Sequence, residues 1–241
     1  MADVTGPDDT LQDEPRRDGG APLARRDALD LQEGEIKDAV LRMGALVEEA
    51  IRRAARSLVD HDAELALDVI KADTRINDAQ RAVSRLISVA IATQNPVARD
   101  LRYLMTLDHV TYELERIGDH ASSVAKQVRR LAPEPPLADY VQLPAMAEQA
   151  AVLVHGVLRA LVDVDPIAAR EVAALDDEID RLYHATFDEV VELMRQDPAN
   201  VERGTRIIIA SHYLERIGDR STNIAEDIVY LVTGDVEDLN P

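Results

Sequence analysis

The chain contains no cysteine, no tryptophan and only one phenylalanine among its 241 residues. Without cysteine it can form no disulfide, no thiolate metal site and no cysteine nucleophile. With one Phe and six Tyr, few aromatic rings are present on which nucleic-acid bases could stack. The formal net charge of −19 argues further against a nucleic-acid binder, because phosphates are met by basic surfaces. An acidic chain is compatible instead with a bound cation, a basic partner, or solubility alone.

The sequence also lacks the hydrophobic runs of exported and membrane proteins. No N-terminal apolar run indicates a signal peptide, and no apolar stretch comes near the length needed to span a membrane. A Gly-rich phosphate loop and a nucleophile elbow are absent as well. The default expectation is a soluble cytoplasmic protein.

One string of six residues, Leu-Glu-Arg-Ile-Gly-Asp, occurs twice, at 114–119 and at 214–219. The similarity continues on both sides of the string. Residues 73–77 align with 176–180, and 58–62 align with 161–165. A repeat of this length indicates an internal duplication.

The pattern of apolar residues predicts helices throughout the duplicated part. Residues 1–28 are rich in Asp, Pro, Gly and Arg and have no apolar period, which predicts a disordered tail. After them, apolar residues recur at three- and four-residue steps, and no segment alternates like a strand. Asn95-Pro96, Asp165-Pro166 and Asp197-Pro198 each place a good N-cap residue before a proline suited to a first helical turn. The six expected helices are 29–60, 63–93, 97–131, 140–163, 166–195 and 199–233.

We therefore predict an all-α fold of two tandem three-helix bundles. The first repeat covers 29–131 and the second 140–234. The Pro-rich stretch 132–139 is the linker between them, and 235–241 form a tail.

Acidic residues spaced four apart lie on one helix face, and this spacing carries the candidate site. In the second repeat it places Glu215, Asp219 and Asn223 in one row and Asp176 and Asp180 in another, on the preceding helix. If the two rows meet, four carboxylates and an amide line one groove. Because unpaired buried charges are costly, a metal ion or arginines should compensate them. Oxygen ligands favour a hard or borderline metal: iron, manganese, magnesium, calcium or zinc.

The first repeat carries the same arrangement with less charge. Asp73, Glu115 and Asp119 remain, but Asn77 stands where the second repeat has Asp180. We expect the first site to be the weaker one. In both repeats the alternative to a metal site is an acidic helix face that is simply exposed to solvent. Gly118 and Gly218, beside the acids, favour close helix approach, because glycine costs about 1 kcal/mol in a helix interior.

The duplicated motifs resemble those of the PhoU family of phosphate-uptake regulators. The resemblance rests on Glu115 to Asp119, on Glu215 to Asp219 continuing through Asn223-Ile224-Ala225-Glu226, and on the segment 95–102. It covers nearly everything after about residue 34.

The resemblance implies a cytoplasmic, non-enzymatic regulator. Its implied partners are the ATPase subunit of a phosphate ABC transporter and a phosphate-sensing histidine kinase, and its implied state is a homodimer. Some members of the family bind multinuclear iron or zinc clusters, and the same oxygen ligands are compatible with other hard divalent cations. The ligands carried over to this chain are Asp73, Glu115, Asp119, Asp176, Asp180, Glu215 and Asp219, whereas Asn77 departs from a carboxylate.

Two other functions compete with this one. A di-iron oxidase on a ferritin-like bundle needs Glu three residues before His, and none of the six histidines has one. A helical adaptor without a metal is compatible with solvated acids, and it differs from the first interpretation only in the ligand.

Overall fold

The computed structural model describes residues 21–137 and 142–240, and over these residues the chain forms helices and no strand. The first repeat contains α1 (Ala21–Val59), α2 (Ala63–Gln94) and α3 (Arg99–Leu131). The second contains α4 (Gln142–Asp163), α5 (Pro166–Ala173), α6 (Asp176–Gln196), a 3₁₀ turn η1 (Pro198–Asn200) and α7 (Val201–Thr233). The expected all-α fold is confirmed.

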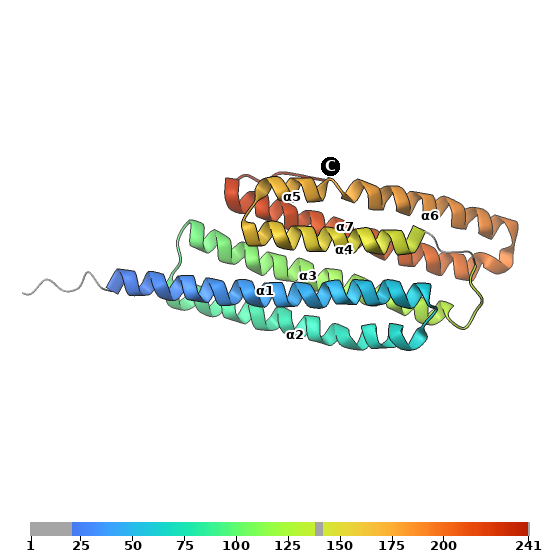
Figure 1. The fold of residues 1–241 in the computed structure, drawn as a ribbon, viewed down its shortest axis with the longest axis horizontal. Coiled ribbons are helices and arrows are strands. Elements are labelled where there is room, and N and C mark those ends of the chain that lie inside the picture. Colours follow the sequence, from blue (N-terminus) through green and yellow to red (C-terminus); the bar gives the residue numbers. More distant parts are fainter. Residues whose placement is uncertain (1–20, 138–141, 241) are drawn as a thin grey trace, which may run out of the picture.

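The two bundles lie side by side with their long axes roughly parallel, and α3 and α7 pack between them (Figure 1). The α3–α7 interface is the most extensive between any two helices of the described chain. Leu114 and Ile117 of α3 and Leu214 and Ile217 of α7 are all buried in one continuous apolar core. The two copies of the repeated string therefore lie on the two central helices of the molecule.

Several helix boundaries follow the capping signals. The side chain of Asp62 accepts hydrogen bonds from the backbone N–H groups of Glu64 and Leu65 and caps α2. Asp165 caps α5 in the same way, before Pro166 in its first turn. Asn95 was expected to cap the third helix and instead ends α2, in the left-handed conformation (φ 47°) that asparagine tolerates.

The predicted tail is too long. α1 begins at Ala21, so residues 21–28 are helical, and residues 1–20 lie outside the described part. Arg26 contacts Asp30 one turn later at 3.3 Å and Asp100 of α3 at 3.0 Å. Leu29 is buried. These contacts extend α1 beyond the point where its apolar period becomes visible in the sequence.

The fifth expected helix is interrupted at Ala174 and Leu175, between α5 and α6. Neither residue breaks helices by itself, so no residue pattern indicated this break. Its consequence is local: Asp176 becomes the first residue of α6, and its side chain is only 3% exposed.

One helix corrects the expectation that no segment could span a membrane. By length and composition alone α4 is apolar enough to do so. Its buried positions, among them Leu143, Met146, Leu153 and Leu161, pack in the core against the other helices. A core helix passes the same test, so α4 is not diagnostic of a span.

Candidate carboxylate site

The expected acidic rows of the second repeat meet where the start of α6 packs against the middle of α7. Asp176 is the most buried of these acids. Its Oδ2 accepts hydrogen bonds from the Thr222 hydroxyl at 3.3 Å and from the Asn240 amide at 3.2 Å. Its Oδ1 is buried and has no hydrogen-bond partner. A buried carboxylate oxygen without a donor is rare in proteins and calls for an explanation.

Gly218 provides the space that the Asp176 carboxylate occupies. A Cβ atom built on Gly218 would lie 2.0 Å from Oδ1 of Asp176 and 3.2 Å from Cδ1 of Ile179. In the first repeat, a Cβ on Gly118 would lie 2.9 Å from Cδ1 of Ile76. The close helix approach expected at both glycines is confirmed, and only in the second repeat does it seat a carboxylate.

The acids of the second repeat are close enough to perturb one another. Burial raises the pKa of Asp176 to about 7, and the charges of Asp180 and Asp219 add to the shift. The pKa of Glu215 is likewise raised to about 7, first by burial and then by Asp219. Burial and Asp219 also raise the pKa of Asp180. We call Asp176, Asp180, Glu215 and Asp219 the α6/α7 cluster.

Basic groups compensate the cluster only at its edge. Arg216, one turn from Asp219 on α7, forms an ion pair with its Oδ2. His212 Nδ1 lies 3.3 Å from Glu215 Oε2. Arg181 does not compensate the cluster, because it pairs with Glu178 on the exposed side of α6.

Asn223, also expected in the cluster, faces elsewhere. Its amide lies 3.4 Å from Glu113 Oε2 on α3, and Asp227, one turn later, lies 2.6 Å from Nδ1 of His109. A row with four-residue spacing drifts by about 40° per step around a helix. Glu215 and Asp219 therefore face α6, whereas Asn223 and Asp227 face α3.

The first repeat assembles its acids as expected, with less charge. The amide of Asn77 donates to Asp73 Oδ2 at 3.4 Å, from one turn further along α2. Burial and Asp119 raise the pKa of Asp73, while Lys126 and Asn77 lower it. Arg116 contacts both Glu115, at 3.3 Å, and Asp119, at 3.1 Å. Groups of its own two helices thus compensate this site in part, and Asp73 Oδ1 and Glu115 Oε2 are buried without a hydrogen-bond donor.

The donor set of the α6/α7 cluster suits a hard cation, since it offers carboxylate oxygens and two of them, Asp176 Oδ1 and Glu215 Oε2, are buried without a hydrogen-bond donor. The side chains do not converge as they stand. Within residues 21–137 and 142–240, no three His, Asp or Glu side chains are grouped closely enough to hold one metal ion. Holding an ion would therefore require the carboxylates to turn toward a common point.

A second polar network, which the sequence did not indicate, links the two repeats. Glu113 of α3 is 2% exposed, and its carboxylate lies 3.2 Å from the guanidinium of Arg220 on α7. His109 lies 3.7 Å from the same carboxylate. Glu113, Arg220 and His109 belong to none of the predicted motifs, and they come together with Asn223 and Asp227 only when α3 packs against α7. We call Glu113, Arg220, His109, Asn223 and Asp227 the α3/α7 network.

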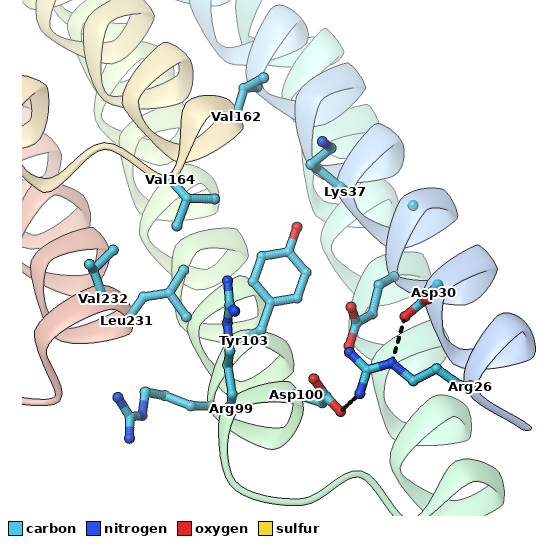
Figure 2. Close-up of a pocket in the computed structure, with 13 residues that line it drawn as sticks. Arg26, Asp30, Lys37, Arg99, Asp100, Tyr103, Val162, Val164, Leu231 and Val232 are labelled. Carbon is cyan, nitrogen blue, oxygen red and sulfur yellow. Dashed lines mark hydrogen bonds and ion pairs between the residues drawn. The ribbon is translucent and has the colours of Figure 1, made fainter. Parts of the chain in front are cut away.

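A cavity of about 860 Å³ lies at the other end of the inter-repeat interface, between α1, α3 and the ends of α4 and α7. Figure 2 shows Arg26 paired with Asp30 and Asp100 on one side of this cavity. Apolar side chains of the second repeat, Val162, Val164, Leu231 and Val232, lie on the opposite side. Four basic and three acidic side chains line it: Arg26, Lys37, Arg99, Arg102, Asp30, Glu33 and Asp100. Their charges largely cancel, so the lining indicates neither an anion nor a cation.

The whole arrangement can be compared with known proteins. The model of the PhoU domain matches the chain twice, at residues 40–128 and 143–228. The chain belongs to the PhoU family. The two matches coincide with the two repeats and place one acidic site in each domain.

Relatives and solved structures agree with the family. The phosphate-specific transport system accessory protein PhoU homolog of Clostridium acetobutylicum is 36% identical over 207 residues, which cover 86% of this chain and 94% of that protein. The crystal structure of PhoU from Pseudomonas aeruginosa matches with a TM-score of 0.82 at 35% identity, over 86% of this chain and 99% of the other. The phosphate transport system regulatory protein PhoU from Streptococcus pneumoniae matches with a TM-score of 0.81 at 32% identity, over 87% and 99%.

Proposed function

We propose that this chain is a cytoplasmic, non-enzymatic regulator of phosphate uptake and of phosphate-starvation signalling. The observation that carries the proposal is the pair of PhoU domains, since relatives that match almost end to end are named accessory or regulatory proteins of phosphate transport. Its partners would be the ATPase subunit of a phosphate importer and a phosphate-sensing histidine kinase. The net charge of −19 favours basic patches on those partners, with association weakening as salt rises. We also expect a homodimer.

We propose in addition that the α6/α7 cluster binds a cation. The unpartnered Oδ1 of Asp176 and the raised pKa values of its neighbours support this, because a cation would satisfy both. Asp176, Asp180, Glu215 and Asp219 would hold it, with iron or zinc as the expected metals and other hard divalent ions compatible. Asp73, Asn77, Glu115 and Asp119 would form the weaker site, while Asn223, which faces Glu113, would support the cluster only indirectly.

Regulation without a metal is the second candidate. It is favoured by the absence, within the described residues, of three converging ligand side chains. In that case the acids shape the surface that partners recognise. Both candidates share the regulatory role and differ only in the ligand.

The experiment for the shared role is a deletion. Cells lacking the protein should repress phosphate uptake and a phosphate-starvation reporter poorly when phosphate is abundant. Expression of the full chain should restore repression. Unchanged uptake and unchanged reporter expression, in a host without a second such regulator, would refute the role.

A further inference from the structure

The segment that follows α7 does not leave the molecule. Gly234, in the left-handed conformation (φ 80°), ends the helix and donates its N–H to the carbonyl of Tyr230. The chain then turns back, and Figure 1 shows it running along α5 to the break between α5 and α6. We call residues 235–240 the strap.

Two contacts hold the strap along its length. Glu237 accepts two hydrogen bonds from the guanidinium of Arg170 on α5, at 2.6 and 2.9 Å. The backbone N–H of Leu239 donates to Glu226 of α7 at 2.9 Å, and the Leu239 side chain packs against the core. A paired arginine fork and a packed leucine fix the register of the residue that follows.

That residue is Asn240, and it reaches the mouth of the α6/α7 cluster. Its amide nitrogen lies 3.2 Å from Oδ2 of Asp176 and 3.5 Å from Oδ1 of Asp219. One donor group thus bridges carboxylates from α6 and α7. The partial positive charge of this amide occupies the position that a cation bound by both Asp176 and Asp219 would take.

The first repeat shows what this amide replaces. There the amide that contacts the corresponding aspartate, Asp73, belongs to Asn77 on the same helix. The second repeat has Asp180 at the position of Asn77. The amide that contacts Asp176 therefore comes from Asn240 of the strap instead. An amide fixed in α2 cannot leave its site, whereas an amide on the strap can leave when the strap detaches.

We propose that the strap closes the α6/α7 cluster through Asn240 and competes with a cation for Asp176 and Asp219. The inference rests on the cation-binding role proposed above. With a tethered competitor, the apparent affinity equals the intrinsic affinity multiplied by the fraction of molecules in which the site is open. A strap that is docked in nine molecules of ten therefore weakens cation binding by about 10-fold.

The test titrates the full chain with Mn²⁺ and measures free Mn²⁺ by electron paramagnetic resonance. Asn240→Ala removes the competing amide. Glu237→Gln weakens the anchor on Arg170 and leaves every cluster residue in place. Glu202→Gln is the matched control. It removes an exposed ion pair with Arg206, and Glu202 lies thirteen positions before Glu215 on the same helix, away from the cluster. We expect about 10-fold tighter binding in the first two variants and no change in the third.

A second readout follows the strap itself. In the wild type, Mn²⁺ should speed hydrogen exchange at the Leu239 amide, whose acceptor is Glu226. Binding by the variants alone, with none by the wild type, would also support the competition. Equal affinity in all four proteins would overturn the strap and leave the cation site standing. Weaker binding by Asn240→Ala would overturn it too, since Asn240 would then be a ligand. Absence of binding in every protein would overturn both the strap and the cation site, while the deletion experiment would still decide the regulatory role.

Discussion

Gly218 and Asp176 share one volume: a Cβ on the glycine would come within 2.0 Å of the carboxylate oxygen Oδ1. Gly218→Ala must therefore displace Asp176 or separate α6 from α7. We expect the loss of packing, about 1–3 kcal/mol, to exceed the gain in helix propensity, about 1 kcal/mol. Urea unfolding measures the change.

Gly34→Ala is the control for this substitution. Gly34 also lies within a helix, and a Cβ there would meet nothing within 4 Å. This variant should gain about 0.5–1 kcal/mol of stability. If Gly218→Ala raises the free energy of unfolding as much as Gly34→Ala does, the Asp176 carboxylate does not occupy the space beside Gly218.

The α6/α7 cluster should make the metal-free protein less stable as the pH rises. The folded pKa values of Asp176 and Glu215, about 7, exceed the unfolded values of about 4. The stabilising contribution is thus complete below pH about 4 and is lost as the pH rises through 7, at no more than about 1.4 kcal/mol per pH unit for each group. Asp176→Asn should flatten this part of the profile in the presence of a chelator. An unchanged slope would mean that folding does not raise the pKa of Asp176.

The pair formed by Glu113 and Arg220 should matter more than exposed pairs. Arg220→Ala leaves a carboxylate that is 2% exposed without its arginine, which typically costs about 3–5 kcal/mol. Arg81→Ala breaks an exposed pair with Asp78 and should cost less than about 1 kcal/mol. Chemical denaturation compares the two variants. Similar small losses in both would show that Glu113 is hydrated or protonated in the fold.

Two histidines of the central helices should titrate far apart. A hydrogen bond with Asp227 raises the pKa of His109 above its ordinary value, whereas burial lowers the pKa of His120 to about 4. The stability that His109 contributes is complete below its unfolded pKa of about 6.5 and is lost as the pH rises through its folded value. Proton NMR titration should show this order, and Asp227→Asn should lower the pKa of His109. Titration of both rings near 6.5 would contradict the network.

The sequence was sufficient for what depends on local pattern. Apolar spacing predicted the helices, Asp165 before Pro166 predicted the start of one of them, and the repeated string predicted which acids approach one another. What it missed depends on packing between distant segments. The break before Asp176 arises where α6 seats a carboxylate against Gly218, and no residue in it is a helix breaker.

The remaining misses have the same origin. Glu113 and Arg220 are unremarkable on their own helices and become partners only across the interface of the two repeats. Asn240 is more than twenty positions from either Asp176 or Asp219, and only the turn at Gly234 brings it to them. Local pattern could not reveal these partners.

The most direct test of the account is metal analysis of the full chain, purified without an affinity tag or chelator. We expect bound metal in the wild type, a marked loss in the double variant Glu215→Ala/Asp219→Ala, and a smaller loss in the matched double variant of the first repeat, Glu115→Ala/Asp119→Ala. Helical circular dichroism spectra should be the same for all three proteins. A wild type without metal, or equal metal content in all three, would contradict the claim that the α6/α7 cluster is the principal cation site of this PhoU-family chain.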